Sequence, residues 1–111
     1  EVDVSGMAAE VQRLFEEDKI YLNPKLKLSD VALAVGTNRT YLSRYFNRQN
    51  GQTFYDYVNS YRIQYAENLL KSTNFPLPEI AIKSGFNSIS TLRRVFFASF
   101  GCSPNKYRVN A

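Results

Sequence analysis

Apolar side chains recur along this chain at the three- and four-residue spacing of amphipathic helices. Met7, Val11, Leu14 and Phe15 share one face, which predicts a half-buried helix over residues 7–18. Similar stripes, bounded by glycine, proline and hydroxyl residues, predict further helices. Their approximate ranges are 28–35, 39–50, 54–71, 77–84, a segment capped by Asn87 or Ser88 that reaches Phe100, and 104–108. No strand-like alternation occurs, so the expected class is all-α with about seven helices.

This pattern nearly repeats itself within the chain. Residues 31–38 align with residues 80–87 at an offset of 49, and after one extra residue the offset becomes 50. The second offset places Leu42, Arg44, Phe46, Gly51 and Tyr57 on Leu92, Arg94, Phe96, Gly101 and Tyr107. Each copy consists of a short apolar helix, a glycine turn and a longer helix with an outward arginine. That order is typical of a helix-turn-helix.

The repeat and the segments around it predict the organisation of the chain. Residues 1–27 are an N-terminal helix and connector belonging to the first subdomain, and residues 28–52 are the first helix-turn-helix. Residues 53–73 form a linker helix, and residues 74–111 form the second helix-turn-helix with a C-terminal helix. The linker's expected apolar stripe consists of Phe54, Val58, Tyr61, Tyr65, Leu69 and Leu70.

Charge is distributed unevenly between the two ends of the chain. Residues 1–30 carry seven acidic and four basic side chains, whereas residues 31–111 carry ten basic and three acidic ones. A surface of this kind favours polyanions such as nucleic acid, although a solvated basic face without a partner gives the same composition. No run is long enough for a membrane span and no signal peptide is present, so no membrane contact is expected of this segment. The first residue is Glu rather than Met, which favours a piece of a longer protein.

The residue types that most enzymes and metal sites need are scarce. The chain has no His and one Cys, so a His general base and a Cys-based zinc site are excluded. It also lacks a glycine-rich phosphate loop, and most of its carboxylates precede Val31. We therefore expect no enzymatic activity and no cofactor. Cys102 is expected to be a small, buried or half-buried thiol.

The second helix of each copy separates apolar from polar residues. Leu42, Tyr45 and Phe46 share one face of residues 39–50, and Leu92, Val95 and Phe96 share one face of the later helix. The opposite faces carry Thr40, Ser43, Arg44, Asn47 and Arg48 in the first copy, and Ser90, Arg93, Arg94 and Phe97 in the second. Arginine can bond guanine O6 and N7, and an apolar residue such as Ile89 can meet a thymine methyl. Two such helices on one face of B-DNA need a separation of about 34 Å.

Contacts to phosphates are expected to position these helices. The N-terminal ends of the two helices, where Asn38, Asn87 and Ser88 lie, offer backbone N–H groups. The basic candidates are Arg39, Arg48, Lys83 and Lys106.

From Leu28 to Arg108 the chain resembles the DNA-binding domain of AraC/XylS-type transcription regulators. In the first half the matching residues are Asp30-Val31-Ala32, Gly36, Tyr41 to Phe46, Gly51, Phe54, Tyr57, Arg62-Ile63, Ala66 and Leu69-Leu70. In the second half they are Glu79-Ile80-Ala81, Gly85-Phe86-Asn87, Leu92, Arg94-Val95-Phe96, Gly101, Ser103-Pro104 and Tyr107-Arg108. They occur in order and with the family's spacing over about three-quarters of the chain.

This resemblance implies a seven-helix fold, promoter binding and transcriptional control, usually activation through contact with RNA polymerase. The family's base-reading positions fall on Thr40, Ser43 and Arg44, and on Ile89, Ser90, Arg93 and Arg94. An effector-binding or signalling domain commonly precedes this region. The expected location is cytoplasmic, although in some members of the family this domain ends a protein that is anchored in the membrane through another domain.

The chain departs from the family pattern at two places. Phe97-Ala98 stands where basic residues usually follow the second recognition segment. Phe97 either packs on a neighbouring helix or forms an exposed apolar spot for a partner. Pro76 replaces the usual hydroxyl cap before the helix at 77–84. A competing hypothesis makes the chain a helical protein-interaction or dimerisation module with non-specific DNA affinity.

Overall fold

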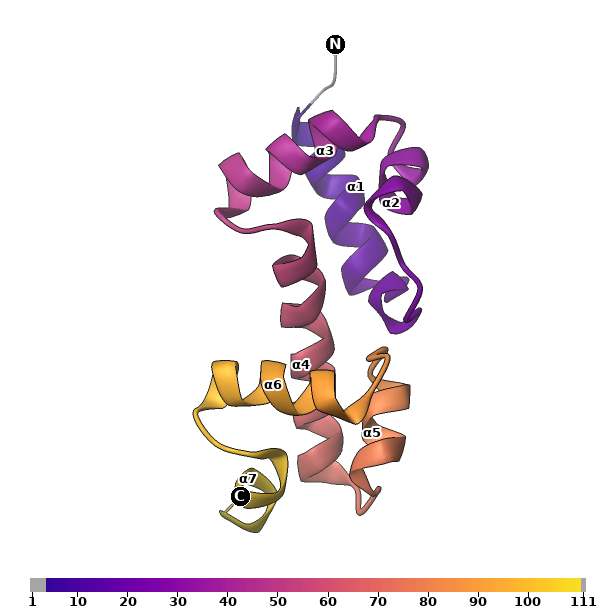
Figure 1. The fold of residues 1–111 in the computed structure, drawn as a ribbon. Coiled ribbons are helices and arrows are strands. Elements are labelled where there is room, and N and C mark those ends of the chain that lie inside the picture. Colours follow the sequence, from indigo (N-terminus) through magenta and orange to yellow (C-terminus); the bar gives the residue numbers. More distant parts are fainter. Residues whose placement is uncertain (1–3, 111) are drawn as a thin grey trace. The chain divides into compact units, whose positions relative to one another are not determined.

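The computed structural model describes residues 4–110, and within that range every regular element is helical, as predicted (Figure 1). The α-helices are α1 (Val4–Glu16), α2 (Leu28–Ala34), α3 (Arg39–Tyr45), α4 (Phe54–Ser72), α5 (Leu77–Lys83), α6 (Ile89–Phe100) and α7 (Pro104–Asn110). A 3₁₀ turn, Ile20–Leu22, lies in the connector after α1. A π-helical segment, Phe46–Asn50, continues α3 up to Gly51, so the predicted helix 39–50 has the expected extent but changes its winding.

The chain divides into two compact units, one ending at Val58 and the other beginning at Asn59. The boundary lies within α4, so its first five residues belong to the first unit and the rest to the second. The first unit contains α1, α2 and α3, and the second contains α5, α6 and α7. Each unit therefore has a helix-turn-helix with one helical segment before it and one after it.

The internal repeat extends into the helix that follows each helix-turn-helix. Phe46 and Tyr57 have ring centroids 4.8 Å apart, and their counterparts Phe96 and Tyr107 have centroids 5.2 Å apart. The following helices also begin alike. The Asp56 backbone N–H donates to Thr53 Oγ1 at 3.1 Å, and the Lys106 N–H donates to Ser103 Oγ at 3.2 Å. The start of α4 is thus the structural counterpart of α7.

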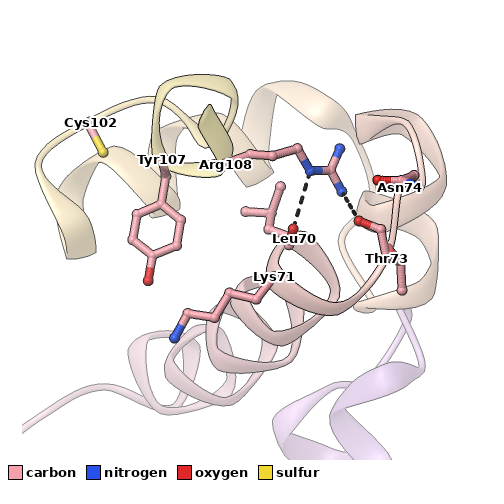
Figure 2. A pocket seen from close by; sticks show the side chains of 7 residues that line it. All are labelled: Leu70, Lys71, Thr73, Asn74, Cys102, Tyr107 and Arg108. Carbon is pink, nitrogen blue, oxygen red and sulfur yellow. Dashed lines mark hydrogen bonds between the residues drawn. The ribbon is translucent and has the colours of Figure 1, made fainter. Parts of the chain in front are cut away.

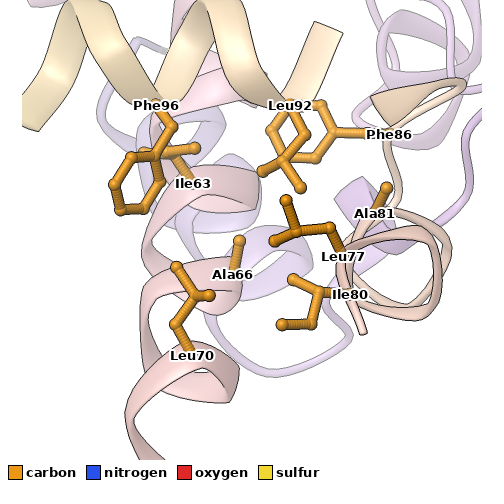
Figure 3. Close-up of a cluster of buried hydrophobic side chains, with 9 residues drawn as sticks. All are labelled: Ile63, Ala66, Leu70, Leu77, Ile80, Ala81, Phe86, Leu92 and Phe96. Atoms are coloured by element: carbon orange, nitrogen blue, oxygen red, sulfur yellow. The ribbon is translucent and has the colours of Figure 1, made fainter. Parts of the chain in front are cut away.

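The core of the second unit is formed by nine buried side chains (Figure 3). They come from α4, α5, α6 and the turn before α6: Ile63, Ala66, Leu70, Leu77, Ile80, Ala81, Phe86, Leu92 and Phe96. The predicted stripe of α4 was incomplete. Its six residues are all buried or half-buried, but Ile63 and Ala66, which the prediction left out, are more deeply buried than Tyr61 and Tyr65. Half-burial leaves the hydroxyl groups of Tyr61 and Tyr65 close to water, whereas an aliphatic side chain has no polar atom that needs a partner.

The turn of each helix-turn-helix is closed in the same way. Gly36 and Gly85 follow α2 and α5 with φ of 77° and 88°, a conformation that side chains disfavour. Helices α3 and α6, which follow these turns, then begin with side-chain caps. Asn38 Oδ1 accepts the Tyr41 N–H at 3.0 Å, and Ser88 Oγ accepts the Thr91 N–H at 3.2 Å. The predicted caps are confirmed, with Ser88 rather than Asn87 as the cap of α6.

Removal of the α6 cap is expected to lower stability by a moderate amount. Ser88→Ala leaves an N-terminal N–H of α6 without its acceptor and should cost about 1 kcal/mol of unfolding free energy. Thermal denaturation followed by circular dichroism measures this loss. Ser90→Ala is the matched control, because Ser90 is exposed in the same first turn and does not cap the helix. Equal effects of both substitutions would contradict the assigned cap.

Candidate nucleic-acid interface

Helix α3 and its π-helical extension present a polar face because their apolar residues enter the core of the first unit. Leu42 and Phe46 are fully buried. Thr40 and Arg44 are exposed and Ser43 is half-buried. Asn47 and Arg48, which lie in the extension, are exposed as well. The predicted readout residues of the first copy thus lie on one helix.

Helix α6 shows the same division in the second unit. Leu92 and Phe96 are fully buried. Ser90, Arg93 and Arg94 are exposed, and Ile89 is half-buried at the first position of the helix. Arg44 and Arg94, which occupy equivalent positions of the repeat, are therefore both on the surface.

The predicted phosphate contacts are all exposed, but some have partners within the protein. The seven residues are Asn38, Arg39, Arg48, Asn87, Ser88, Lys83 and Lys106. Asn38 and Ser88 use a side-chain oxygen as a helix cap. Lys83 Nζ lies 3.8 Å from the Glu79 carboxylate and 5.4 Å from the centroid of the Phe75 ring. Lys83 therefore has to leave a local ion pair in order to contact a phosphate.

A shallow groove of about 530 Å³ marks the turn of the first helix-turn-helix. Its lining comprises Ser29, Ala32, Leu33, Thr37, Asn38, Arg39 and Thr40. Sequence reasoning missed Thr37 and Leu33. Thr37 Oγ1 is buried and has no hydrogen-bond partner among the described residues, and Leu33 is 83% exposed. The internal repeat did not indicate Thr37 as a site residue, because its counterpart in the second copy is the core residue Phe86.

A larger hollow of about 710 Å³ lies in the second unit, and the cationic side chains that line it bond other groups of the protein (Figure 2). Arg108 donates to three main-chain carbonyls at the C-terminal end of α4 and the loop after it. The distances are 3.3 Å from Nε to Leu70 O, 3.1 Å from Nη2 to Thr73 O and 2.7 Å from Nη1 to Phe75 O. Cys102 also lines the hollow and is half-buried, as predicted.

The second cation of this hollow is also engaged. Lys71 Nζ lies 3.3 Å from the Glu67 carboxylate, which accepts a hydrogen bond from the Tyr107 hydroxyl. These contacts with Glu67 raise the pKa of Tyr107 and of Lys71 above their ordinary values. The hydrogen bond from Tyr107 to Glu67 links α7 to α4, while Lys71 pairs with Glu67 within α4. The hollow is a poor anion site, because its basic groups already have partners.

Comparison with known proteins identifies the domain. A family model described as "Helix-turn-helix domain" matches residues 21–110. The chain belongs to the AraC-type helix-turn-helix family. This AraC-type domain is 40% identical over 87 residues to the uncharacterized HTH-type transcriptional regulator YfiF of Bacillus subtilis, covering 78% of the chain but 27% of that relative.

Two further relatives are proteins of Salmonella typhimurium. The multiple antibiotic resistance protein MarA is 32% identical over 88 residues, covering 79% of the chain and 69% of MarA. The regulatory protein SoxS is 32% identical over 98 residues, covering 88% of the chain and 92% of SoxS.

Solved structures share the fold. The C-terminal domain of AraT, a response regulator from Geobacillus stearothermophilus, superposes with a TM-score of 0.87 at 27% identity, covering 99% of this chain and 89% of that one. The DNA-binding domain of AdpA, solved with a target DNA, gives a TM-score of 0.82 at 24% identity. The match covers 95% of this chain and 91% of the AdpA chain.

Family membership confirms the predictions of DNA binding, of a role in transcription regulation and of a domain without enzymatic activity. The AraC-type domain is a DNA-binding domain of transcription regulators and not an enzyme. Within residues 4–110, no helix has the length and apolar character that crossing a bilayer requires.

Proposed function

We propose that the AraC-type domain binds double-stranded DNA in a sequence-specific manner, with α3 and α6 in successive major grooves. The observation that carries this proposal is the repetition of one arrangement in both units. A buried Leu and Phe fix each helix in its core, while an Arg at the equivalent position remains on the surface. A major groove admits one α-helix, whose N-terminal residues reach the base edges.

The proposed readout assigns different chemistry to different side chains. Arg44, Arg93 and Arg94 bond guanine or phosphate oxygens, and Thr40, Ser43 and Ser90 bond bases or nearby phosphates. Ile89 is the apolar contact at the start of α6. Phosphates are contacted by two kinds of group. One is the set of N-terminal N–H groups of α3 and α6 that do not bond the capping side chains, and the other is the side chains of Arg39, Arg48 and Lys106.

Replacement of a readout arginine is expected to weaken binding and to relax specificity at one position. Arg44→Ala or Arg94→Ala should each cost about 1–3 kcal/mol on the preferred site. Fluorescence anisotropy with a site selected from random DNA measures this loss, and a repeated selection with each variant reports specificity. Arg13→Ala is the matched control: it removes the same charge from α1, where Arg13 pairs with Glu10 at 2.7 Å and Asp18 at 3.0 Å.

Three outcomes distinguish the candidate functions. Binding by both arginine variants that equals that of the parent would contradict the readout. Affinity that falls steeply with salt but shows no preferred sequence would indicate backbone contacts alone. Self-association without salt-dependent DNA binding would favour the protein-interaction module.

The regulatory context is part of the same proposal. The domain acts in the cytoplasm, where it activates transcription by contacting RNA polymerase beside its binding site. It receives its signal from an effector or sensor domain on its N-terminal side. The YfiF relative extends beyond the matched domain, since the match covers 27% of its length. Transcription in vitro with purified polymerase and the whole regulator tests the activation step.

A further inference from the structure

Two adjacent phenylalanines of α6 have opposite environments. Phe96 is fully buried, whereas Phe97 is 60% exposed. Packing on a neighbouring helix would cover most of the Phe97 ring, so the exposed alternative is the one that the structure supports. A large apolar ring in water is unfavourable in the free domain and becomes favourable when a partner covers it.

The position of Phe97 on the helix indicates which partner covers it. Successive residues of an α-helix turn by about 100°, so positions three, four and seven apart share a face. Phe97 follows Arg94 by three residues, Arg93 by four and Ser90 by seven. Its ring therefore lies in the middle of the exposed polar and cationic face of α6, one helical turn beyond the two arginines.

We propose that Phe97 is a specificity-determining residue that packs its ring against the C5-methyl group of a thymine in the DNA site. This inference rests on the proposed insertion of α6 into a major groove. The thymine methyl is the apolar group that a major groove displays, and phenylalanine is among the side chains that contact it. One helical turn advances about 5.4 Å, so this thymine lies one or two base pairs beyond the one contacted by Arg93.

Charge favours the duplex over a protein partner as the occupant of this surface. An apolar protein patch that covered Phe97 would also cover Arg93, and would have to remove its guanidinium group from water. Buried charges without partners are costly. DNA satisfies both requirements together, because a major groove displays thymine methyl groups beside hydrogen-bond acceptors on the base edges and between two rows of phosphates.

The experiment removes the methyl group and the ring separately. A site is selected from random DNA with the parent domain, and each thymine in turn is replaced by deoxyuridine, which lacks only the C5-methyl group. At one thymine of the half contacted by α6, this replacement should weaken the parent about three- to fivefold, the size expected for one buried methyl group. Phe97→Ala should bind the thymine site about three- to tenfold more weakly and show no further loss with deoxyuridine.

Controls separate the ring contact from folding and from charge. Phe97 is exposed, so Phe97→Ala should keep the parent's circular dichroism spectrum and melting temperature. Val109→Ala removes an apolar side chain that is 82% exposed on α7 and should leave the thymine preference intact. Phe97→Lys restores the basic residue usual in the family, and it should lose the methyl dependence while its affinity becomes more sensitive to salt.

The outcomes also separate this inference from the proposed function. If the parent enriches no sequence, sequence-specific binding itself fails and the Phe97 contact fails with it. If the parent enriches a site but every deoxyuridine replacement affects parent and Phe97→Ala equally, the thymine contact is overturned while specific binding stands. Self-association of the parent that Phe97→Ala abolishes, with no methyl dependence, would show a protein contact instead.

Discussion

Phe96→Ala is expected to reduce the unfolding free energy of the second unit by about 3–5 kcal/mol. Phe96 is fully buried in the core, and its ring centroid lies 4.5 Å from that of Phe100 and 5.2 Å from that of Tyr107. Truncation removes apolar contacts from α4, α6 and α7 together and leaves a cavity that these helices cannot fill. Urea denaturation followed by circular dichroism measures the loss.

The neighbouring residue provides the matched control for this experiment. Phe97→Ala removes the same atoms one position later in α6, but from the exposed face, and should change stability by less than about 0.5 kcal/mol. In the first unit Phe46 is the repeat counterpart of Phe96 and is also fully buried, so Phe46→Ala should be similarly destabilising. Similar stabilities of the Phe96 and Phe97 variants would contradict the orientation of α6.

Arg108→Ala is expected to cost the second unit about 2–3 kcal/mol of unfolding free energy. Its guanidinium donates to the carbonyl oxygens of Leu70, Thr73 and Phe75, which lie at the C-terminal end of α4 and in the loop leading to α5. Hydrogen bonds from a charged donor are stronger than neutral ones, and carbonyls left without donors add a desolvation cost. Thermal denaturation of the parent domain and of the Arg108→Ala variant at the same ionic strength measures this difference in stability.

Arg108→Lys tests whether geometry or charge is responsible. Lysine keeps the positive charge but has no planar fork that can reach three carbonyls, so it should recover less than half of the lost stability. Footprinting on a selected DNA site adds a second measurement. Because Arg108 holds α7 and the loop before α5, its loss should weaken protection in the half contacted by α6 more than in the other half. Full recovery of stability in the Arg108→Lys variant would contradict the proposal that the planar guanidinium and its three hydrogen bonds are required.

Most of the local structure was predictable from the sequence because its causes are local. The apolar spacing predicts the helices of Figure 1, and residues with distinctive backbone chemistry mark their ends. Asn38, Ser88 and Thr53 cap helices through their own side chains, and Gly36 and Gly85 adopt positive φ. Each of these contacts joins residues a few positions apart.

The contacts that the sequence did not reveal join residues far apart in the chain. Arg108 and Leu70 are separated by 38 residues, and Tyr107 and Glu67 by 40. The core residues of α4 were incompletely predicted for the same reason. Its tyrosines and aliphatic residues both follow a helical spacing, and only the packing of α5 and α6 against it selects Ile63 and Ala66 as core residues.

The sequence alone determined the all-α class, the doubled helix-turn-helix and the polar face of each recognition helix. These follow from hydrophobic periodicity and capping, which depend on neighbours within one or two turns. Tertiary structure decided which face of α4 each unit buries, that Arg108 clamps the end of α4, and that Phe97 remains exposed beside Arg93 and Arg94. Burial depends on what packs against a side chain, and that depends on segments many residues away.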